Sequence, residues 1–335
     1  MDEEIGLYGD HKVTYAMADL ITYAGQLAVS FEKASEVIKK FTGITVSESL
    51  IREITEESGQ KVFEEDIKRA KKSYEKPELA FEELLDKDKK EGVLYILTDG
   101  SQVNTNRKQN GSSWHEMKLG LVFSDHNSIK RKDEKSIIVQ KEYVAYLGGV
   151  AEFKKLLFDA AVRAGYGKIR NVVVIGDGAH WIWNMCEELF PNAVQILDYY
   201  HMVENVNIFA KYLHSNNEVK AKGWANQVIR EVENGHIDEV LKELPDLKGE
   251  KLPANVPNLK VYLENNKERT HYEQYKLKGY SVGSGAIESG NKSVIQQRMK
   301  QAGMRWSISG GQCIASLRAK YSSNQWDKVR EAIGL

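Results

Sequence analysis

The sequence predicts an α/β protein in which a mixed β-sheet covered by helices follows an amino-terminal helical region. Two observations lead to this fold class. Residues 13–90 have helical patterns. From residue 93 the sequence pattern changes to apolar runs rich in residues that favour strands. From that point the segments follow the order strand, strand, strand, helix, strand, helix, strand, and helical patterns return after residue 202.

The amino-terminal region contains amphipathic helical patterns at residues 13–29, 30–43 and 48–74. Ser30 and either Ser47 or Ser49 fit the N-cap position, and Gly43 fits a helix end. A helix, a short turn and a second helix around Gly43 fit a helix-turn-helix, but they fit an ordinary helical hairpin equally well. The highly charged residues 75–92 predict a boundary near residue 90.

The strand-rich region has a characteristic order of elements. Strands are expected at residues 93–100, 114–124, 136–148, 171–178 and 193–201, and helices at 150–165 and 181–190. Three meandering strands followed by alternating helices and strands is the order of the ribonuclease H-like fold. The expected domains are a helical region at 1–90, the first part of the core at 91–202, a helical insertion at 203–280 and the completion of the core at 281–335.

Composition and charge exclude several classes of protein. The 335 residues carry a formal net charge of −1, so a nucleic acid would have to meet a local basic patch or cations held by acidic residues. Cys186 and Cys313 lie in unrelated contexts, which argues against a cysteine-built zinc site and a disulfide framework. With neither a signal peptide nor an apolar run of transmembrane length, we expect a cytoplasmic protein without a membrane partner.

Two aspartates follow the two most apolar strands, each in an Asp-Gly pair. They are Asp99 in Leu97-Thr98-Asp99-Gly100 and Asp177 in Ile175-Gly176-Asp177-Gly178. A carboxylate at the carboxyl end of a strand can bind Mg²⁺, and two such ions about 4 Å apart stabilise both oxygens of a phosphoryl displacement. A single Asp-Gly is more often an ordinary turn, but two at neighbouring strand ends favour a metal site.

A third acidic residue, Glu288, stands in the first turn of a predicted helix after a Gly-Ser-Gly sequence. By itself it would be an acid that complements the helix dipole. The segment between Ser289 and Trp326, however, contains basic residues and no acidic one, which is typical of binding to phosphates. The candidate DNA-binding residues there are Lys292, Arg298, Lys300, Arg305 and Trp306, and the segment also contains Arg318 and Lys320.

Asp198 and His201 form a supporting pair after another predicted strand, in Asp198-Tyr199-Tyr200-His201. His201 could contact a phosphate or the reacting oxygen, and Asp198 could orient it or assist a metal. A structural hydrogen bond is an equally good explanation of this pair. Nearby, Trp181 and Trp183 are expected in the core, and His115 and Glu116 are expected to be structural residues of a strand.

Two long strings resemble one known family. GDGAHWIWNMCEELFPNAVQILDYYH and GSGAIESGNKSVIQQRMKQAGMRW are similar to bacterial insertion-sequence transposases of the Kra type, themselves distantly like the Mutator-like superfamily. The likeness extends over nearly the whole chain, from GLYGDHKVTYAMADLITYAG onward. The resemblance implies a ribonuclease H-like DDE transposase whose acidic triad is Asp99, Asp177 and Glu288. It also identifies Asp198 and His201 with an Asp-x-x-His element that follows the fifth strand.

The resemblance carries further expectations. It implies two Mg²⁺ ions, with Mn²⁺ as a substitute, DNA in the form of element ends and target, and a homodimer or larger assembly on DNA. Relatives often carry a cysteine-rich segment ahead of the GLYG motif, whereas this chain starts at Met1 without such cysteines. The alternative hypotheses are therefore a shortened or repurposed DNA-binding protein without catalysis, and a structure-directed nuclease of the same fold.

Overall fold

The computed structural model describes residues 6–80, 85–109, 111–130, 136–247 and 249–335. The chain forms two compact units, and each is described by itself. Unit 1 comprises residues 1–94, 99–170 and 287–335, and unit 2 comprises residues 95–98 and 171–286. Among the described residues, no helix combines the length and the apolar character that a membrane span requires.

Unit 1 begins with the predicted helices α2 (Tyr15–Leu27), α3 (Phe31–Thr42) and α4 (Glu48–Glu75), followed by the short α5 (Pro77–Ala80). Ser30 caps α3 by accepting a hydrogen bond from the Lys33 amide, and Ser47 caps α4 in the same way. Gly43 ends α3 with a φ of 75°, a conformation that glycine adopts at little cost. These caps confirm the predicted helix starts and ends.

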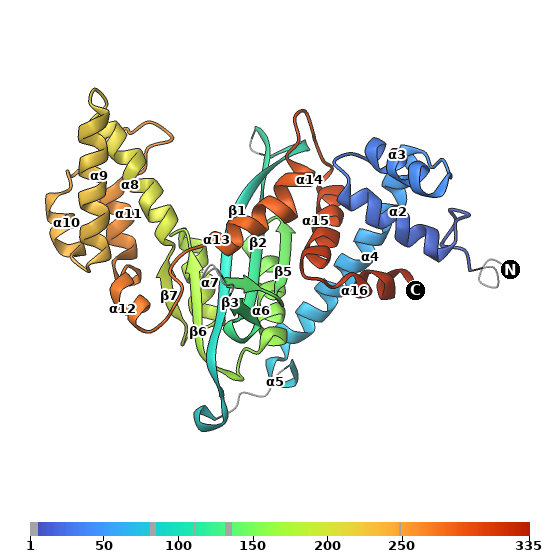
Figure 1. The fold of residues 1–335 in the computed structure, drawn as a ribbon, viewed down its shortest axis with the longest axis horizontal. Helices are drawn as coiled ribbons and strands as arrows, with labels where there is room; N and C mark the ends of the chain where they lie inside the picture. The colour runs from blue at the N-terminus through green and yellow to red at the C-terminus, as the bar shows by residue number, and fades with distance from the viewer. Residues whose placement is uncertain (1–5, 81–84, 110, 131–135, 248) are drawn as a thin grey trace. The chain divides into compact units, whose positions relative to one another are not determined.

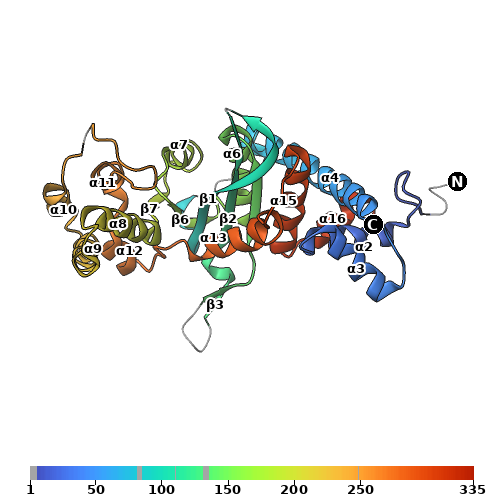
Figure 2. The same ribbon diagram turned by 90° about the horizontal axis from the view of Figure 1, so that it is seen from above.

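A small apolar core holds the amino-terminal helices together. Its fully buried members include Ile21 of α2, Ile38 of α3 and Ile54 of α4, together with Ile333 from the last helix of the chain. That helix is α16 (Trp326–Ile333), and it packs with α2 and with α15 (Ile308–Ser322) against α4, as Figure 2 shows. The carboxyl terminus therefore stabilises the amino-terminal helices by burying apolar surface between them.

The sheet has five strands in the order β5-β2-β1-β6-β7, and a second sheet pairs β3 with β4. β2 runs antiparallel to β5, whereas β6 and β7 are parallel, so the larger sheet is mixed. This arrangement confirms the predicted α/β class. The strands are β1 (Lys90–Gln109), β2 (Ser112–Ser124), β3 (Ser128–Lys130), β4 (Ser136–Ile138), β5 (Glu142–Leu147), β6 (Ile169–Gly176) and β7 (Val194–Leu197).

Strand β1 differs from the prediction, which ended it in a turn at Asp99-Gly100. The strand continues through this pair to Gln109. Ser101, Val103 and Thr105 are buried whereas the positions between them are more exposed, so the alternation of a half-buried strand persists beyond the aspartate. Asp99 therefore lies within a strand, not at its end.

The expected third strand, 136–148, also differs, because it is split into two pieces. Its first part, β4, pairs with β3, and only its second part, β5, joins the main sheet. The polar residues Gln140 and Lys141 lie between the two pieces and interrupt the alternation of the apolar side chains. Residues 131–135, which directly precede β4, lie outside the described residues.

Helix α6 (Val150–Ala164) packs against β2 and β5 and brings a buried carboxylate to α4. Asp159 of α6 is 2% exposed. Its Oδ1 accepts a hydrogen bond from the Ser73 hydroxyl at 2.8 Å, and its Oδ2 accepts one from Arg69 Nε at 2.9 Å. Arg163 Nε lies 3.3 Å from the same Oδ2. The buried carboxylate thus joins α6 to α4 through Arg69 and Ser73, while Arg163 of α6 itself adds a second guanidinium.

Unit 2 contains β6, β7 and a set of helices. Helices α8, α9, α10 and α11 lie side by side (Figure 1), and Phe209, Val232 and Leu263 are buried in them. Trp183 is 4% exposed, as expected of a core residue. The helices are α7 (His180–Leu189), α8 (Tyr199–Leu213), α9 (Glu218–Glu233), α10 (Ile237–Glu243), α11 (Leu259–Asn266) and α12 (Tyr272–Leu277).

The helix that follows Gly283 changes its winding part-way along. It starts as α13 (Gly285–Gly290), continues as the π-helical segment η4 (Asn291–Gln296) and ends as α14 (Gln297–Met299). A π-helix is rare and is found most often near functional sites. The predicted helix is therefore present, but its hydrogen-bonding pattern widens directly after the first turns, which contain Glu288.

Candidate functional site

Asp177 stands in the turn between β6 and α7. Its Oδ1 accepts a hydrogen bond from the Ala179 amide at 2.9 Å, and its backbone oxygen accepts one from the Tyr262 hydroxyl at 3.0 Å. Gly178 has a φ of +100°, and an added Cβ would lie 2.8 Å from the Tyr262 ring, so no other residue fits there without strain. The predicted Asp-Gly turn is confirmed here, and it holds a half-buried carboxylate at the end of a buried strand.

Asp99 is held differently, from within β1. Its Oδ1 accepts a hydrogen bond from the Gly100 amide at 2.7 Å, and its Oδ2 accepts one from the Nδ2 of Asn291. Asn291 is 5% exposed, and its buried Oδ1 has no hydrogen-bond partner among the described residues. An unpartnered amide oxygen beside a carboxylate is an unfavourable arrangement by itself. A hard cation would satisfy both, because Mg²⁺ and Ca²⁺ prefer oxygen ligands.

Sequence reasoning did not single out Asn291. The signal was its spacing, since it follows Glu288 by three positions and residues so spaced share a helix face. Local packing fixes its place: a Cβ added at Gly290 would lie 2.4 Å from the Tyr143 ring, so only glycine allows this approach. Glu288 itself is exposed in the first turn of α13, where it complements the helix dipole as predicted.

Asp198 and His201 form a hydrogen-bonded group with Ser284 in unit 2. Asp198 is fully buried and caps α8, accepting from the Tyr200 and His201 amides. The Ser284 amide and hydroxyl each donate to it at 2.7 Å, and the Nδ1 of His201 contacts its Oδ2. Burial raises the pKa of Asp198, but the hydrogen bonds from His201 and Ser284 outweigh it, so the pKa lies below its ordinary value.

Both carboxylate oxygens of Asp198 accept hydrogen bonds, so little acceptor capacity is left on this side chain. The contact of its Oδ2 with the Nδ1 of His201 fixes the orientation of the imidazole ring.

Comparison with known proteins places the chain in a family. A family description matches residues 1–332. The chain belongs to the uncharacterised protein family UPF0236. No curated protein matches this UPF0236 chain. Among solved structures, the Drosophila P element transposase strand transfer complex is weakly similar, with 9% sequence identity and a TM-score of 0.29 over 92% of this chain and 80% of that chain.

In this UPF0236 member, two of the expected DNA-binding residues lie in the interior. Arg298 is 1% exposed and Trp306 is 5% exposed. The Arg298 guanidinium lies over the rings of Phe31 and Trp306 and donates to the Gly25 carbonyl. Burial and the neighbouring Arg318 charge lower its pKa to about 10. The expectation that these side chains face DNA is corrected, because they pack unit 1 together through cation–π contacts.

The other basic residues between Ser289 and Trp326 are partly buried in structural contacts and partly exposed. Arg318 donates to the backbone carbonyls of Val294 and Gln26, and Lys320 forms an ion pair with Asp66 at 2.8 Å, so both are structural. Lys292, Lys300 and Arg305 are exposed, and the Lys300 ammonium donates to the Ser101 hydroxyl at 3.1 Å. Three of the five candidate DNA-binding residues are therefore accessible to a phosphate.

Proposed function

We propose that this protein is a DDE transposase with a ribonuclease H-like core, which cleaves DNA at element ends and joins them to target DNA. The two long strings around Asp177 and Glu288 support the proposal through their likeness to insertion-sequence transposases. The observation that carries it in the structure is the buried, unpartnered Oδ1 of Asn291 beside the Asp99 carboxylate. A cation bound beside Asp99 would satisfy this oxygen.

The acidic triad of Asp99, Asp177 and Glu288 would hold two Mg²⁺ ions, with Mn²⁺ as a substitute. Bound Mg²⁺ supplies a Lewis acid that activates the attacking oxygen and stabilises the leaving oxygen of a phosphodiester. The chain's part is to fix the carboxylates: the Gly100 and Ala179 amides orient Asp99 and Asp177. In strand transfer, the oxygen of a freed 3′-hydroxyl would bond to a phosphorus of the target strand and lose its proton to water. The bond from that phosphorus to the 3′ oxygen of the target strand would break, leaving a new 3′-hydroxyl end.

Asp198 and His201 would support the reaction through proton positioning. Because the Nδ1 of His201 is directed at Asp198, the Nε2 is the ring nitrogen that can face a phosphate or a reacting oxygen. Ser284 keeps Asp198 in place through two hydrogen bonds. Asp198 is thus proposed as a positioning residue. The exposed Lys292, Lys300 and Arg305 would bind the phosphates of DNA, and a homodimer or larger assembly would pair two ends.

The proposal predicts metal-dependent cleavage followed by joining. The purified protein, mixed with DNA that carries the sequences flanking its own gene, should nick that DNA in Mg²⁺ or Mn²⁺. EDTA should abolish cleavage and excess Mg²⁺ should restore it, because the acidic triad has no activity without the cation. Joined products, detected by sequencing across new junctions in a target plasmid, are the decisive measurement.

Two other outcomes would replace the proposal. Binding to DNA without cleavage in either metal would favour a shortened or repurposed DNA-binding protein. Cleavage without any joined product would favour a structure-directed nuclease of the same fold. Either result contradicts transposition, since a transposase must both cleave the element ends and attach them to a target.

The role of Asn291 can be measured apart from catalysis. We expect Asn291→Ala to weaken Mn²⁺ binding about tenfold or more, as calorimetry of the protein without DNA would measure, because a ligand or its supporting partner is lost. Asn291→Asp keeps an oxygen ligand and should bind Mn²⁺ better than the alanine variant. Gln296→Ala, an exposed amide on the same helix, is the matched control. Equal Mn²⁺ affinity of wild type and Asn291→Ala would remove Asn291 from the site.

A further inference from the structure

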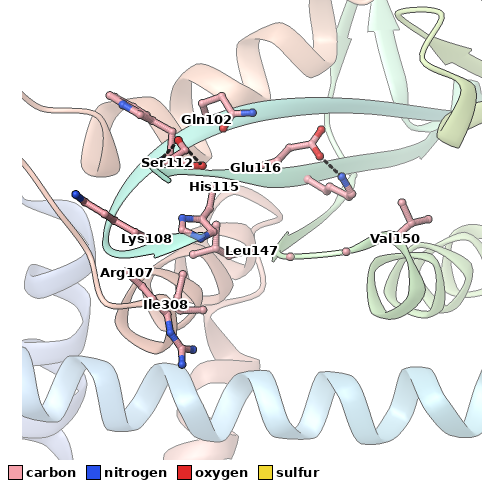
Figure 3. A pocket seen from close by; sticks show the side chains of 13 residues that line it. Gln102, Arg107, Lys108, Ser112, His115, Glu116, Leu147, Val150 and Ile308 are labelled. Atoms are coloured by element: carbon pink, nitrogen blue, oxygen red, sulfur yellow. Dashed lines mark hydrogen bonds and ion pairs between the residues drawn. The ribbon is translucent and has the colours of Figure 1, made fainter. Parts of the chain in front are cut away.

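A groove lies beside the β1–β2 hairpin of unit 1, among residues that the proposed metal chemistry does not use. Its volume is about 780 Å³, within the range of pockets that enclose whole ligands. Figure 3 shows the hairpin as one wall of the groove, and the chain from Leu147 to Val150, which leads into α6, as the other. Lys108 and Arg107 lie near the turn of the hairpin, and Ile308 of α15 lies near Arg107.

The groove is positively charged at the turn of the hairpin. Glu116 is its one acidic lining residue among the described side chains, and it forms an ion pair with Lys118, which is 3% exposed. Arg107 and Lys108 are exposed, and neither forms an ion pair with a described residue. The groove therefore presents two uncompensated cations to solvent, which suits a polyanion.

Aromatic rings flank these cations. Trp114 of β2 is 52% exposed and lines the groove, an unusual position for the largest apolar side chain. An adjoining hollow of about 450 Å³ shares Arg107 as a lining residue and contains the rings of Phe63 and Tyr146. These two rings are stacked, with centroids 6.1 Å apart and planes 21° apart, and both are half-buried. Arg107 thus lines both the hollow that contains Trp114 and the hollow that contains the Phe63–Tyr146 pair.

We propose that this groove binds single-stranded DNA, whose bases stack on Trp114 and on the Phe63–Tyr146 pair while phosphates meet Arg107 and Lys108. Cations alternating with aromatic rings is the arrangement by which proteins hold single strands without reading sequence. Duplex DNA is the poorer fit, because its bases are already stacked and cannot reach the rings. The choice of DNA as the partner rests on the proposed function.

The test measures binding in EDTA, so that cleavage plays no part. Fluorescence anisotropy would follow a labelled oligothymidylate of about 16 nucleotides and a duplex of the same length. We expect Trp114→Ala to raise the Kd for the single strand about tenfold or more and Trp114→Phe to restore most of the loss, since a phenyl ring still stacks. Tyr212→Ala, which removes an aromatic ring that is 37% exposed in unit 2, is the matched control.

A second measurement tests the cations. Arg107→Ala combined with Lys108→Ala should reduce the slope of log Kd against log salt concentration by about 1.4, because each phosphate contact on a single strand contributes about 0.7. Lys220→Ala combined with Lys222→Ala removes two exposed cations from α9 and should leave the slope unchanged.

Wild-type affinity of Trp114→Ala for the single strand would overturn the proposal, and so would a wild-type protein that binds only the duplex. These results are separable from the proposed function. If the protein cleaves and joins DNA but Trp114→Ala binds normally, only the groove assignment fails. If Trp114→Ala loses single-strand binding but wild type never cleaves DNA, only the transposase assignment fails.

Discussion

Asp177→Asn is expected to lower the rate of Mg²⁺-dependent DNA cleavage about a thousandfold or more. A metal-bound carboxylate contributes several kcal/mol to stabilising the charged transition state, and each 1.4 kcal/mol corresponds to a tenfold change in rate. The amide oxygen of asparagine still accepts the hydrogen bond from the Ala179 amide, so the turn between β6 and α7 should keep its shape. Single-turnover cleavage at saturating Mg²⁺ is the appropriate measurement.

The control for this variant is Glu264→Gln. Glu264 is exposed on α11, the same helix whose Tyr262 donates to the Asp177 backbone, and the substitution removes the same unit of charge. We expect it to cleave as wild type does. Circular dichroism should show the same thermal unfolding for all three proteins. Cleavage by a folded Asp177→Asn at the wild-type rate would remove Asp177 from the triad.

Asp159→Ala should lower the stability of unit 1 by several times more than the loss of an exposed ion pair would. The carboxylate is 2% exposed and is bound by Ser73, Arg69 and Arg163. Breaking a buried ion pair typically costs about 3–5 kcal/mol, and the partial exposure of both arginines favours the lower end, about 3 kcal/mol. Urea unfolding followed by circular dichroism measures this as a lower midpoint with an unchanged slope.

Glu152→Ala is the matched comparison on the same helix. Glu152 forms an ion pair with Lys155 at 2.7 Å, and its side chain is 38% exposed. A pair in contact with water contributes under about 1 kcal/mol, so this variant should unfold close to the wild-type midpoint. An equal loss in the free energy of unfolding for the two variants would show that the buried contacts of Asp159 stabilise the packing of α6 on α4 no more than an exposed ion pair does.

Local signals in the sequence were enough for most elements. The Ser30 cap and the Gly43 helix end act through a few neighbouring residues, and a reader of the sequence can recognise them. The Asp-Gly turn at Asp177 is similarly local. The same dipeptide at Asp99 led to a wrong prediction of a turn. Burial alternates beyond it, with Ser101 and Val103 buried, and this keeps the strand paired in the sheet. Tertiary pairing outweighed a local turn preference there.

The candidate site was predictable only in part, for a related reason. Carboxylates and an imidazole stand out because few other side chains bind metals, so Asp99, Asp177 and His201 could be singled out from spacing. Asn291 could not, since its importance lies in an unpaired oxygen that only the packing reveals. Arg298 shows the opposite error. A guanidinium next to aromatic rings is as suited to a core as to DNA, and the sequence does not record which face is buried.

The π-helical segment at Asn291–Gln296 determines the angle, about the helix axis, between the side chains of α13 before it and those of α14 after it. After this segment, Arg298 of α14 is buried in the interior of unit 1, so the direction in which α14 faces is fixed. Each residue of an α-helix turns the chain by about 100°, so a one-residue widening offsets the preceding turns by a comparable angle. Glu288 thus owes its direction to the wider winding of the π-helical segment that follows it. A substitution that restored α-helical winding there would turn Glu288 by a comparable angle, with every acidic residue retained.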